Sequence, residues 1–319
     1  MKIIYLDQNH WICLSGATNG RSSGSVSSSF VESLHQARRT GRACFPLSYA
    51  HYLETRKVRK PDRRSRLATC MSELSDGRTV APSAAVIRHE IEMALCRCFS
   101  NRVVPEPFEF LGHGLAHAAA NRNLDLPPPP WPPGANPVPA LLRAAIEGFY
   151  RADVERRLLS GVRLTGTELG PLTDLSVERN FKESLEQWRG AASKYQRGEL
   201  EREICDGNFS DIDDLLREAL ARYAISLDEF SRRGELSGRA FLDYMPSQRA
   251  DMHLKMQWAK NANLKPRDSD LVDWSFLGVA VSYCDIVVTE NQMADLFSRG
   301  FETRATVIAK LDQLPELLA

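Results

Sequence analysis

The chain has 319 residues, and its 41 lysines and arginines balance 41 aspartates and glutamates, so the formal net charge is zero. This balance excludes a uniformly basic nucleic-acid coat and an acidic solvating tail as descriptions of the whole protein. The composition, 43% hydrophobic and 26% charged, is that of a globular chain with one elaborated domain or two.

The first hundred residues predict short strands that alternate with helices. Residues 3–6 form an apolar run with β-branched residues, which is typical of a buried strand. The Ser/Gly-rich residues 16–29 indicate a flexible loop, and Ser29 with Glu32 predicts a capping box that opens a helix to about residue 40. The elements expected next are strand 43–47, helix 48–58 capped by Ser48, helix 61–74, strand 79–81 and helix 83–99.

The middle of the chain has a different character. Residues 127–139 are rich in proline and cannot continue a helix or a central strand, so they predict an extended linker. Residues 140–233 have a helical pattern in which Ser210 and Asp213 indicate another cap. Near the end we expect helix 247–261, helix 271–283, strand 286–289, strand 306–308 and helix 311–318.

Strands separated by helices are typical of a parallel α/β sheet with helices on both faces. Because the strands lie at both ends of the chain, we predict one α/β domain formed by residues 1–99 and 246–319. Residues 100–245 are then a large, mostly α-helical insertion that contains the proline-rich linker. The alternative is a two-domain protein in which the helical segment forms a separate unit.

Four carboxylates are expected at one edge of the sheet. Asp7 and Glu290 each directly follow a predicted strand, which places them beyond the carboxyl ends of strands, where open α/β sheets bind ligands. Glu54 and Asp273 each lie near the start of a helix that connects two strands. Such helices run antiparallel to the strands, so their first turns lie at the same edge.

Clustered carboxylates repel one another unless cations neutralise them. The natural partners are hard divalent cations that prefer oxygen ligands, Mg²⁺ or Mn²⁺. Two such cations can activate a water molecule and stabilise the leaving oxygen of a phosphodiester. The four acids therefore indicate metal-dependent chemistry on phosphodiesters, in which they act as metal ligands and as the catalytic residues.

The charges are distributed unevenly along the chain. Residues 1–75 carry 12 basic and 5 acidic side chains, a net charge of +7, whereas residues 266–319 carry 4 and 9, a net charge of −5. The basic excess is concentrated in residues 56–66, with seven cations and one acid. Basic side chains near the acids are expected to contact the phosphate backbone, and the candidates are Arg56, Lys57, Arg249 and Lys260.

The segments that carry the four acids resemble the PIN-like nuclease superfamily. YLDQNHW at residues 5–11 is similar to its opening strand, with Asp7 and Asn9, and FPLSYAHYLETRK supplies the internal Glu54. DWSFLGVAVSYCDIVVTEN is similar to the closing block, in which Asp273 stands 16 residues before Thr289. The resemblance covers about residues 1–95 and 245–319. It implies a metal-dependent endonuclease, usually acting on RNA, with a sheet of about five parallel strands.

A longer pattern is similar to a bacterial PIN-like branch that opens with LDQN-x-W. That branch carries PLS-x-x-H-x-x-E, a helix with an internal glutamate, here Glu90, then Pro-Ser-x-Arg at residues 246–249 and Tyr-Cys-Asp at residues 283–285. The chain departs from the family at Asn291, where the usual final acid would fall. Either Glu290 takes over that role or the site holds only one metal well.

The same interpretation gives supporting roles to further residues. His51 stands three positions before Glu54 and is expected to hydrogen-bond a ligand carboxylate. Glu90 is either a structural residue or a site residue whose helix leans over the metal. Direct or water-mediated contacts to the metal are expected from Asn9, Asp270 and Asn291.

We therefore predict a cytoplasmic Mg²⁺- or Mn²⁺-dependent endoribonuclease that acts on single-stranded RNA. The cytoplasm is expected because the seven cysteines contain no Cys-x-x-Cys pair, and no apolar run is long enough to cross a membrane. One alternative is a degenerate, non-catalytic PIN-like module that binds RNA, or a partner protein through the helical insertion. Another is a metal-dependent enzyme acting on a nucleotide or sugar nucleotide, which rests on Asp-Ser-Asp at residues 268–270. His113 and His117 have metal-site spacing, but no third ligand is close by in sequence.

Overall fold

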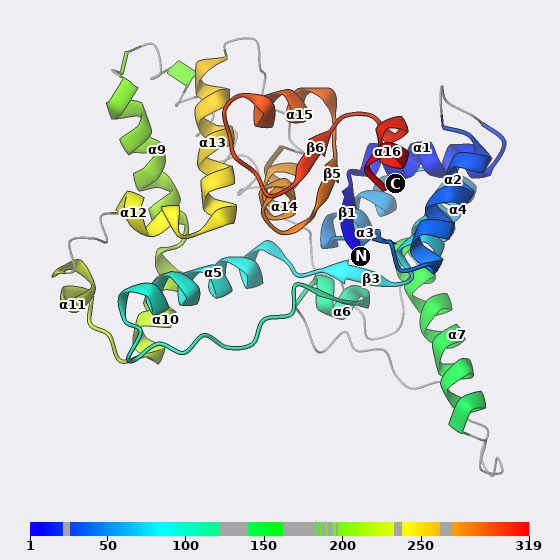
Figure 1. Cartoon of the computed structure of the whole chain (residues 1–319), viewed down its shortest axis with the longest axis horizontal. Coiled ribbons are helices and arrows are strands. Elements are labelled where there is room, and N and C mark those ends of the chain that lie inside the picture. The colour runs from blue at the N-terminus through cyan, green and yellow to red at the C-terminus, as the bar shows by residue number, and fades with distance from the viewer. Residues whose placement is uncertain are drawn as a thin grey trace.

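The computed structural model describes residues 1–21, 26–120, 140–161, 197–232, 238–261 and 270–318, with six isolated positions between residues 183 and 195. The side chains of residues 140–142, 144 and 270–273 lie outside the described part. So do the proline-rich segment 127–139 and the pair Asp268 and Ser269. The protein is a mixed, mostly helical α/β structure built around a parallel sheet (Figure 1). No helix in the described segments is long and apolar enough to span a membrane.

Four parallel strands form the central sheet. Their order is β2 (Ala43–Cys44), β1 (Lys2–Leu6), β5 (Ile286–Val288) and β6 (Thr306–Ile308). The two ends of the chain therefore meet in neighbouring strands, and Leu6 pairs with Val288. Leu6 packs into the core on one face of the sheet and Tyr5 into the core on the other, as expected for strands buried on both sides. The predicted α/β class is confirmed.

A separate two-stranded sheet is linked to the segment that follows β2. β3 (Arg78–Val80) pairs antiparallel with β4 (Leu111–His113), and a single parallel bridge joins Leu47 to Thr79. The predicted strand 43–47 is therefore interrupted: β2 ends at Cys44 and pairing resumes only at Leu47. Pro46 lies in the gap, and proline has no N–H to donate to a strand partner.

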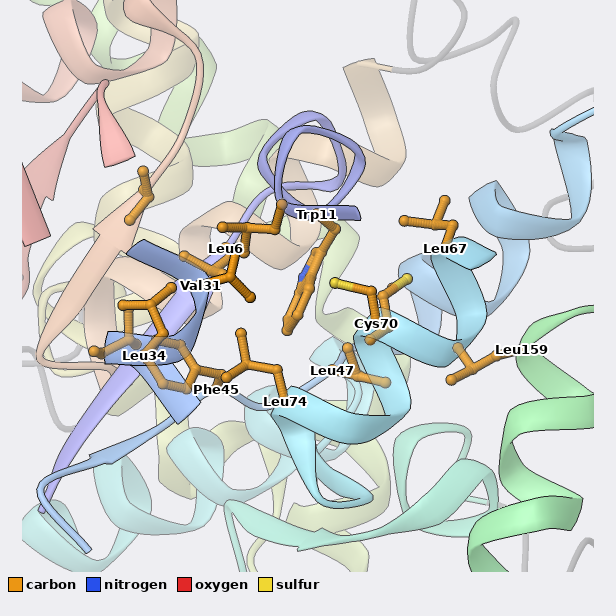
Figure 2. Packing of buried hydrophobic residues seen from close by; sticks show 14 of the residues in the cluster. Leu6, Trp11, Val31, Leu34, Phe45, Leu47, Leu67, Cys70, Leu74 and Leu159 are labelled. Atoms are coloured by element: carbon orange, nitrogen blue, oxygen red, sulfur yellow. The ribbon is translucent and has the colours of Figure 1, made fainter. Parts of the chain in front are cut away.

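Helices cover one face of the sheet with a large apolar core. These are α1 (Gln8–Thr18), α2 (Ser28–Arg39), α4 (Pro61–Ser75) and α7 (Ala140–Leu159). Figure 2 shows the fully buried Trp11 among side chains of the sheet and the helices, including Leu6 of β1, Leu47 and Cys70 of α4. The short 3₁₀ helix η3 (Leu311–Gln313) and α16 (Leu314–Leu318) close this core at the C-terminal end of the chain.

The opposite face of the sheet carries a second core. It is formed by α13 (Pro246–Lys260), α14 (Asp270–Tyr283) and α15 (Asn291–Ser298). Trp258 of α13 and Trp274 of α14 meet edge to face, with ring centroids 5.6 Å apart and an interplanar angle of 72°. In Figure 1 these helices lie on the other side of the sheet from α1, α2 and α4.

The middle of the chain does not form one separate body. α9 (Arg197–Asp211), α10 (Asp213–Arg222), α11 (Leu227–Arg232) and α12 (Gly238–Asp243) pack with α5 (Ser83–Cys98) and α13 in a third core. α7 instead packs on α4 and α3 (Tyr49–Lys57), where its Leu158 and Leu159 join the core around Trp11. The described part of residues 100–245 is mostly helical, with β4 and the short α6 (Gly114–Ala118) near its start.

The first helix was not predicted. α1 runs from Gln8 to Thr18 and passes through Gly16, where the Ser/Gly-rich composition indicated the start of a loop. Leu14 and Ala17 are buried in the core, and this packing against α4 stabilises a segment that has weak helix propensity.

Two predicted caps are also wrong. α2 is capped by Ser27, whose Oγ accepts a hydrogen bond of 3.2 Å from the N–H of Phe30, so Ser29 lies inside the helix. Farther along, α9 continues to Asp211 and Ile212 is the N-cap of α10. Ser210 is therefore part of α9 and begins no helix. Serine at several nearby positions makes the choice of cap ambiguous from sequence.

Candidate functional site

Asp7 and Glu290 stand at the carboxyl edge of two adjacent parallel strands. The backbone N–H of Asp7 donates to the carbonyl of Val288, the last residue of β5, at 2.9 Å. Each acid is the N-cap of the helix that follows its strand, Asp7 for α1 and Glu290 for α15. Their backbone angles are almost the same, φ −63° and ψ 154° for Asp7 and φ −63° and ψ 151° for Glu290. The sheet therefore presents two carboxylates in equivalent positions.

Asn9 connects the two strand ends. Its Nδ2 donates a hydrogen bond of 2.6 Å to Oε1 of Glu290. On the same turn, Nε2 of His10 lies 3.1 Å from the carbonyl oxygen of Thr289. Asn291 is the exposed first residue of α15. The acid that contacts the Asp7 loop is thus Glu290.

The environment of Asp7 disfavours its negative charge. Burial raises the pKa of the Asp7 carboxyl, and the neighbouring charge of Glu290 raises it further. The N–H of Gln8, which donates to Asp7 Oδ1 at 2.6 Å, and the charge of His10 act in the opposite direction. Two carboxylates in a partly desolvated position repel each other, and a bound cation would remove this repulsion.

His51 fixes the backbone next to Asp7 rather than a carboxylate. Its Nδ1 accepts a hydrogen bond of 2.8 Å from the N–H of Ser48, so it takes the place that Glu or Gln usually has in a capping box. Its Nε2 donates to the carbonyl of Leu6 at 2.9 Å. Burial lowers the pKa of His51 to about 4, and the neutral ring is the form that both contacts require. The prediction that His51 contacts a ligand carboxylate is therefore wrong.

Glu54 lies on α3 between two contacts to the Asp7 segment. His51, one turn earlier, bonds Leu6, and Oγ1 of Thr55 accepts a hydrogen bond of 3.1 Å from Nε2 of Gln8. These contacts hold α3 against the residues on both sides of Asp7. The Glu54 side chain is half-buried at that position.

Asp273 and Asp270 are placed only by their backbone. Both lie in the first turn of α14, which ends at Tyr283 just before β5 begins. Because α14 runs antiparallel to β5, its first turn points toward the edge that carries Glu290. Their side chains lie outside the described residues. Among the side chains that are described, no group of three or more His, Cys, Asp or Glu residues is close enough to hold a metal ion.

Glu90 belongs to a different part of the fold. Its buried carboxylate accepts hydrogen bonds from the N–H and Oγ of Ser247, at 2.9 and 2.6 Å, and from the hydroxyl of Tyr283 at 2.9 Å. Burial raises the pKa of Glu90 to about 7, against the effect of these three donors. Tyr283 lies just before β5, at the sheet edge opposite Glu290. Glu90 therefore joins α5, α13 and α14, and these contacts fit the structural one of the two roles predicted for it.

This network unites three segments that are far apart in the chain. Glu90, Ser247 and Tyr283 come from three motifs that are far apart in sequence, yet they form one buried hydrogen-bonded cluster. Asp285 of the Tyr-Cys-Asp motif accepts a hydrogen bond of 2.7 Å from the N–H of Ile3, at the start of β1. These motif residues have structural contacts that position the sheet and its covering helices.

The predicted RNA-contacting cations lie in two places. Arg56 and Lys57 occupy the last turn of α3, where Arg56 packs beside Gly161 and Lys57 is exposed. Arg249 and Lys260 of α13 line a surface pocket of about 540 Å³. Residues 299–302, which follow the C-terminal end of α15, form another part of its wall. Glu290 caps the other end of α15, so this pocket is separate from the candidate carboxylates.

A second pocket contains cations that were not among the four named candidates for phosphate contacts. It measures about 350 Å³, lies between α1 and α4, and includes Arg21, Arg63 and Arg66. Arg63 and Arg66 belong to the basic run at residues 56–66, which was the available signal. Arg21 is distant in sequence and joins them only in the folded chain.

The histidine pair His113 and His117 does not form a metal site. Nδ1 of His117 lies 2.9 Å from Oγ1 of Thr79, and its Nε2 lies 3.1 Å from the carbonyl oxygen of Glu109. Both ring nitrogens are thus engaged in hydrogen bonds within the protein. His117 has the structural role that the sequence favoured.

No protein-family model matches the chain, and comparisons with curated proteins and with solved structures returned no match. The resemblance to the PIN-like superfamily therefore rests on the sequence motifs alone.

Proposed function

We propose that the protein is a PIN-like, Mg²⁺- or Mn²⁺-dependent endoribonuclease with its active site at the edge formed by β1 and β5. The observation that carries the proposal is the pairing of Asp7 and Glu290 as equivalent N-caps on adjacent parallel strands, joined by Asn9. This edge is where open α/β sheets bind ligands. Its described donors are oxygen atoms, which hard divalent cations prefer.

In this proposal the chain's own residues hold and orient the reacting groups. Asp7, Glu290, Glu54 and Asp273 supply the carboxylates, and Asn9 fixes the rotamer of Glu290. His51 holds the Leu6 carbonyl, so the strand end that carries Asp7 is rigid. A divalent cation bound there would supply activation of water and neutralisation of the leaving oxygen. The seven free cysteines fit a reducing compartment such as the cytoplasm.

Cleavage of single-stranded RNA tests the proposal. The wild-type protein is expected to cleave the RNA in the presence of Mg²⁺ or Mn²⁺, and cleavage is expected to stop when a chelator removes the metal. Asp7→Asn and Glu290→Gln are expected to reduce the rate by at least about 100-fold, because each removes a charged metal ligand without changing shape. The matched control is Asp295→Asn, an exposed acid on the same helix as Glu290 that pairs with Arg299. Equal rates in Asp7→Asn and wild-type protein would contradict the proposal.

A second candidate function is a non-catalytic module that binds RNA. It is favoured by Asn291, which stands where the family has its final acid. Such a module would bind the same RNA without cleaving it in either metal. A titration of labelled RNA in parallel with the cleavage assay separates the two functions.

A further inference from the structure

The pocket between α1 and α4 has a composition that suits an anion. It is lined by Ile12, Ser15, Gly16, Asn19, Arg21, Arg63, Arg66 and Leu67. Three of these eight residues are arginines, and none is an acid. Asp62, the one acid of the basic run at residues 56–66, lies outside the lining.

The three arginines have no counter-charge among the residues that the structure describes. Arg21, Arg63 and Arg66 are exposed, and within the described segments none of them forms an ion pair. Many other arginines on the surface do pair, for example Arg38 with Asp76 and Arg217 with Asp213. Three like charges around one hollow repel one another. An anion in the pocket would relieve this repulsion, and the planar guanidinium fork matches the oxygens of a phosphate.

The pocket lies on the same side of α1 as the candidate active site. Ile12, Gly16 and Asn19 follow the spacing i, i+4 and i+7, which defines one face of a helix. Asn9, which contacts Glu290, precedes Ile12 by three residues and falls on that face. An 11-residue helix is about 16 Å long. The same face of α1 therefore contacts Glu290 near its start and lines the arginine pocket farther along.

We propose that this pocket binds a backbone phosphate of single-stranded RNA at a distance from the bond that is cleaved. The inference rests on the proposed function, because it takes RNA as the substrate. The arginines hold the strand along α1, so that another part of it reaches Asp7 and Glu290. Contacts to phosphate carry no sequence information, so the pocket contributes affinity and register rather than base specificity.

Equilibrium binding separates this inference from catalysis. The probe is a fluorescently labelled single-stranded RNA, titrated with the full chain carrying Asp7→Asn in chelator, so that no cleavage occurs. Adding Arg63→Ala and Arg66→Ala is expected to raise Kd by at least about tenfold. It should also reduce the magnitude of the slope of log K against log salt by about 0.7, which is the contribution of one lost phosphate contact on a single strand.

The matched control removes two positive charges elsewhere, with Arg88→Ala and Arg232→Ala on α5 and α11. Each of these arginines is exposed and far from the pocket in sequence. The control should leave Kd and the salt slope close to those of the Asp7→Asn parent. Arg63→Lys with Arg66→Lys keeps the charge but not the fork, and it should fall between parent and double alanine. Unfolding curves of all variants should coincide, since the substituted side chains are exposed.

The outcomes distinguish the two proposals. If the double alanine variant binds RNA as tightly as the parent, the pocket inference is overturned even if wild-type protein cleaves RNA. If the double alanine variant loses affinity and the control does not, the pocket inference stands. In that case absence of cleavage by the wild-type protein would contradict only the proposed nuclease function.

Discussion

The side-chain amide of Asn9 donates a hydrogen bond of 2.6 Å to the carboxylate of Glu290. The two residues come from opposite ends of the chain and meet because β1 and β5 are neighbours in the sheet. This contact identifies Glu290, rather than Asn291, as the acid that faces the Asp7 loop. Through this contact Asn9 orients the Glu290 carboxylate.

Removal of the Asn9 side-chain amide should weaken the binding of the metal without abolishing cleavage. In Asn9→Ala, Glu290 loses the hydrogen bond from Asn9, so its carboxylate is held less firmly in one rotamer. The metal concentration for half-maximal cleavage is expected to rise by about 10- to 100-fold, as for other residues that orient a metal ligand. Cleavage rates measured across a Mn²⁺ series test this. A change in the maximal cleavage rate without a change in the Mn²⁺ concentration for half-maximal cleavage would contradict this role of Asn9.

Substitutions at Glu290 and Asn291 test which of the two residues is the last metal ligand along the chain. If Glu290 has taken over that role, Glu290→Gln should lose at least about 100-fold in cleavage rate, whereas Asn291→Ala should lose far less. The two substitutions are on adjacent residues, so each serves as the control for the other. A larger loss in Asn291→Ala would show that the ligand position has stayed at residue 291.

The buried, neutral His51 should make the fold sensitive to acid. The pKa of His51 is about 4 in the folded protein, below its ordinary value, so the unfolded chain takes up the proton first as the pH falls. Its contribution to stability is therefore present above about pH 6.5 and is lost as the pH falls toward 4. Between about pH 7.5 and 4.5 this loss is roughly 2–3 kcal/mol.

Urea unfolding at several pH values checks the His51 prediction. His51→Gln removes the titrating ring, so its unfolding free energy should fall less between about pH 7.5 and 4.5 than that of the wild-type protein. Other groups titrate in both proteins and cancel in the comparison. Parallel curves for the two proteins would contradict the assignment.

Substitutions in the cluster of Glu90, Ser247 and Tyr283 should lower the free energy of unfolding without changing the cleavage rate. Glu90→Ala removes the acceptor for Ser247 and Tyr283 and leaves buried donors unsatisfied, which is expected to cost about 2–4 kcal/mol in the free energy of unfolding. Tyr283→Phe loses a single hydrogen bond and should cost about 1 kcal/mol. Denaturant curves give these values. If the Glu90→Ala protein is fully folded but cleaves RNA much more slowly, Glu90 has a role in the active site and the structural assignment is contradicted.

The sheet and its edge were predictable because they follow from local sequence. β1 ends directly before Asp7 and β5 ends two residues before Glu290, and parallel pairing alone brings the two acids to one edge. The helix that carries Glu54 begins after Ser48, as predicted. These inferences need only the order of strands and helices.

Features that depend on tertiary packing were not predictable. α1 contains Gly16 and buries the polar Gln8 and Ser15 along with Trp11, so its pattern does not alternate cleanly between apolar and polar faces. The partners of His51 and Glu90 are backbone groups and side chains that approach only in the folded chain. The arginine pocket likewise needs Arg21 to meet α4.

Titration of the protein with Mn²⁺ by calorimetry tests the central claim, that Asp7 and Glu290 hold a divalent cation at the edge formed by β1 and β5. The wild-type protein and the Asp295→Asn control are expected to bind Mn²⁺ with the same affinity. Asp7→Asn and Glu290→Gln are each expected to weaken binding by at least about tenfold. Undiminished Mn²⁺ affinity in both of these variants would contradict the claim.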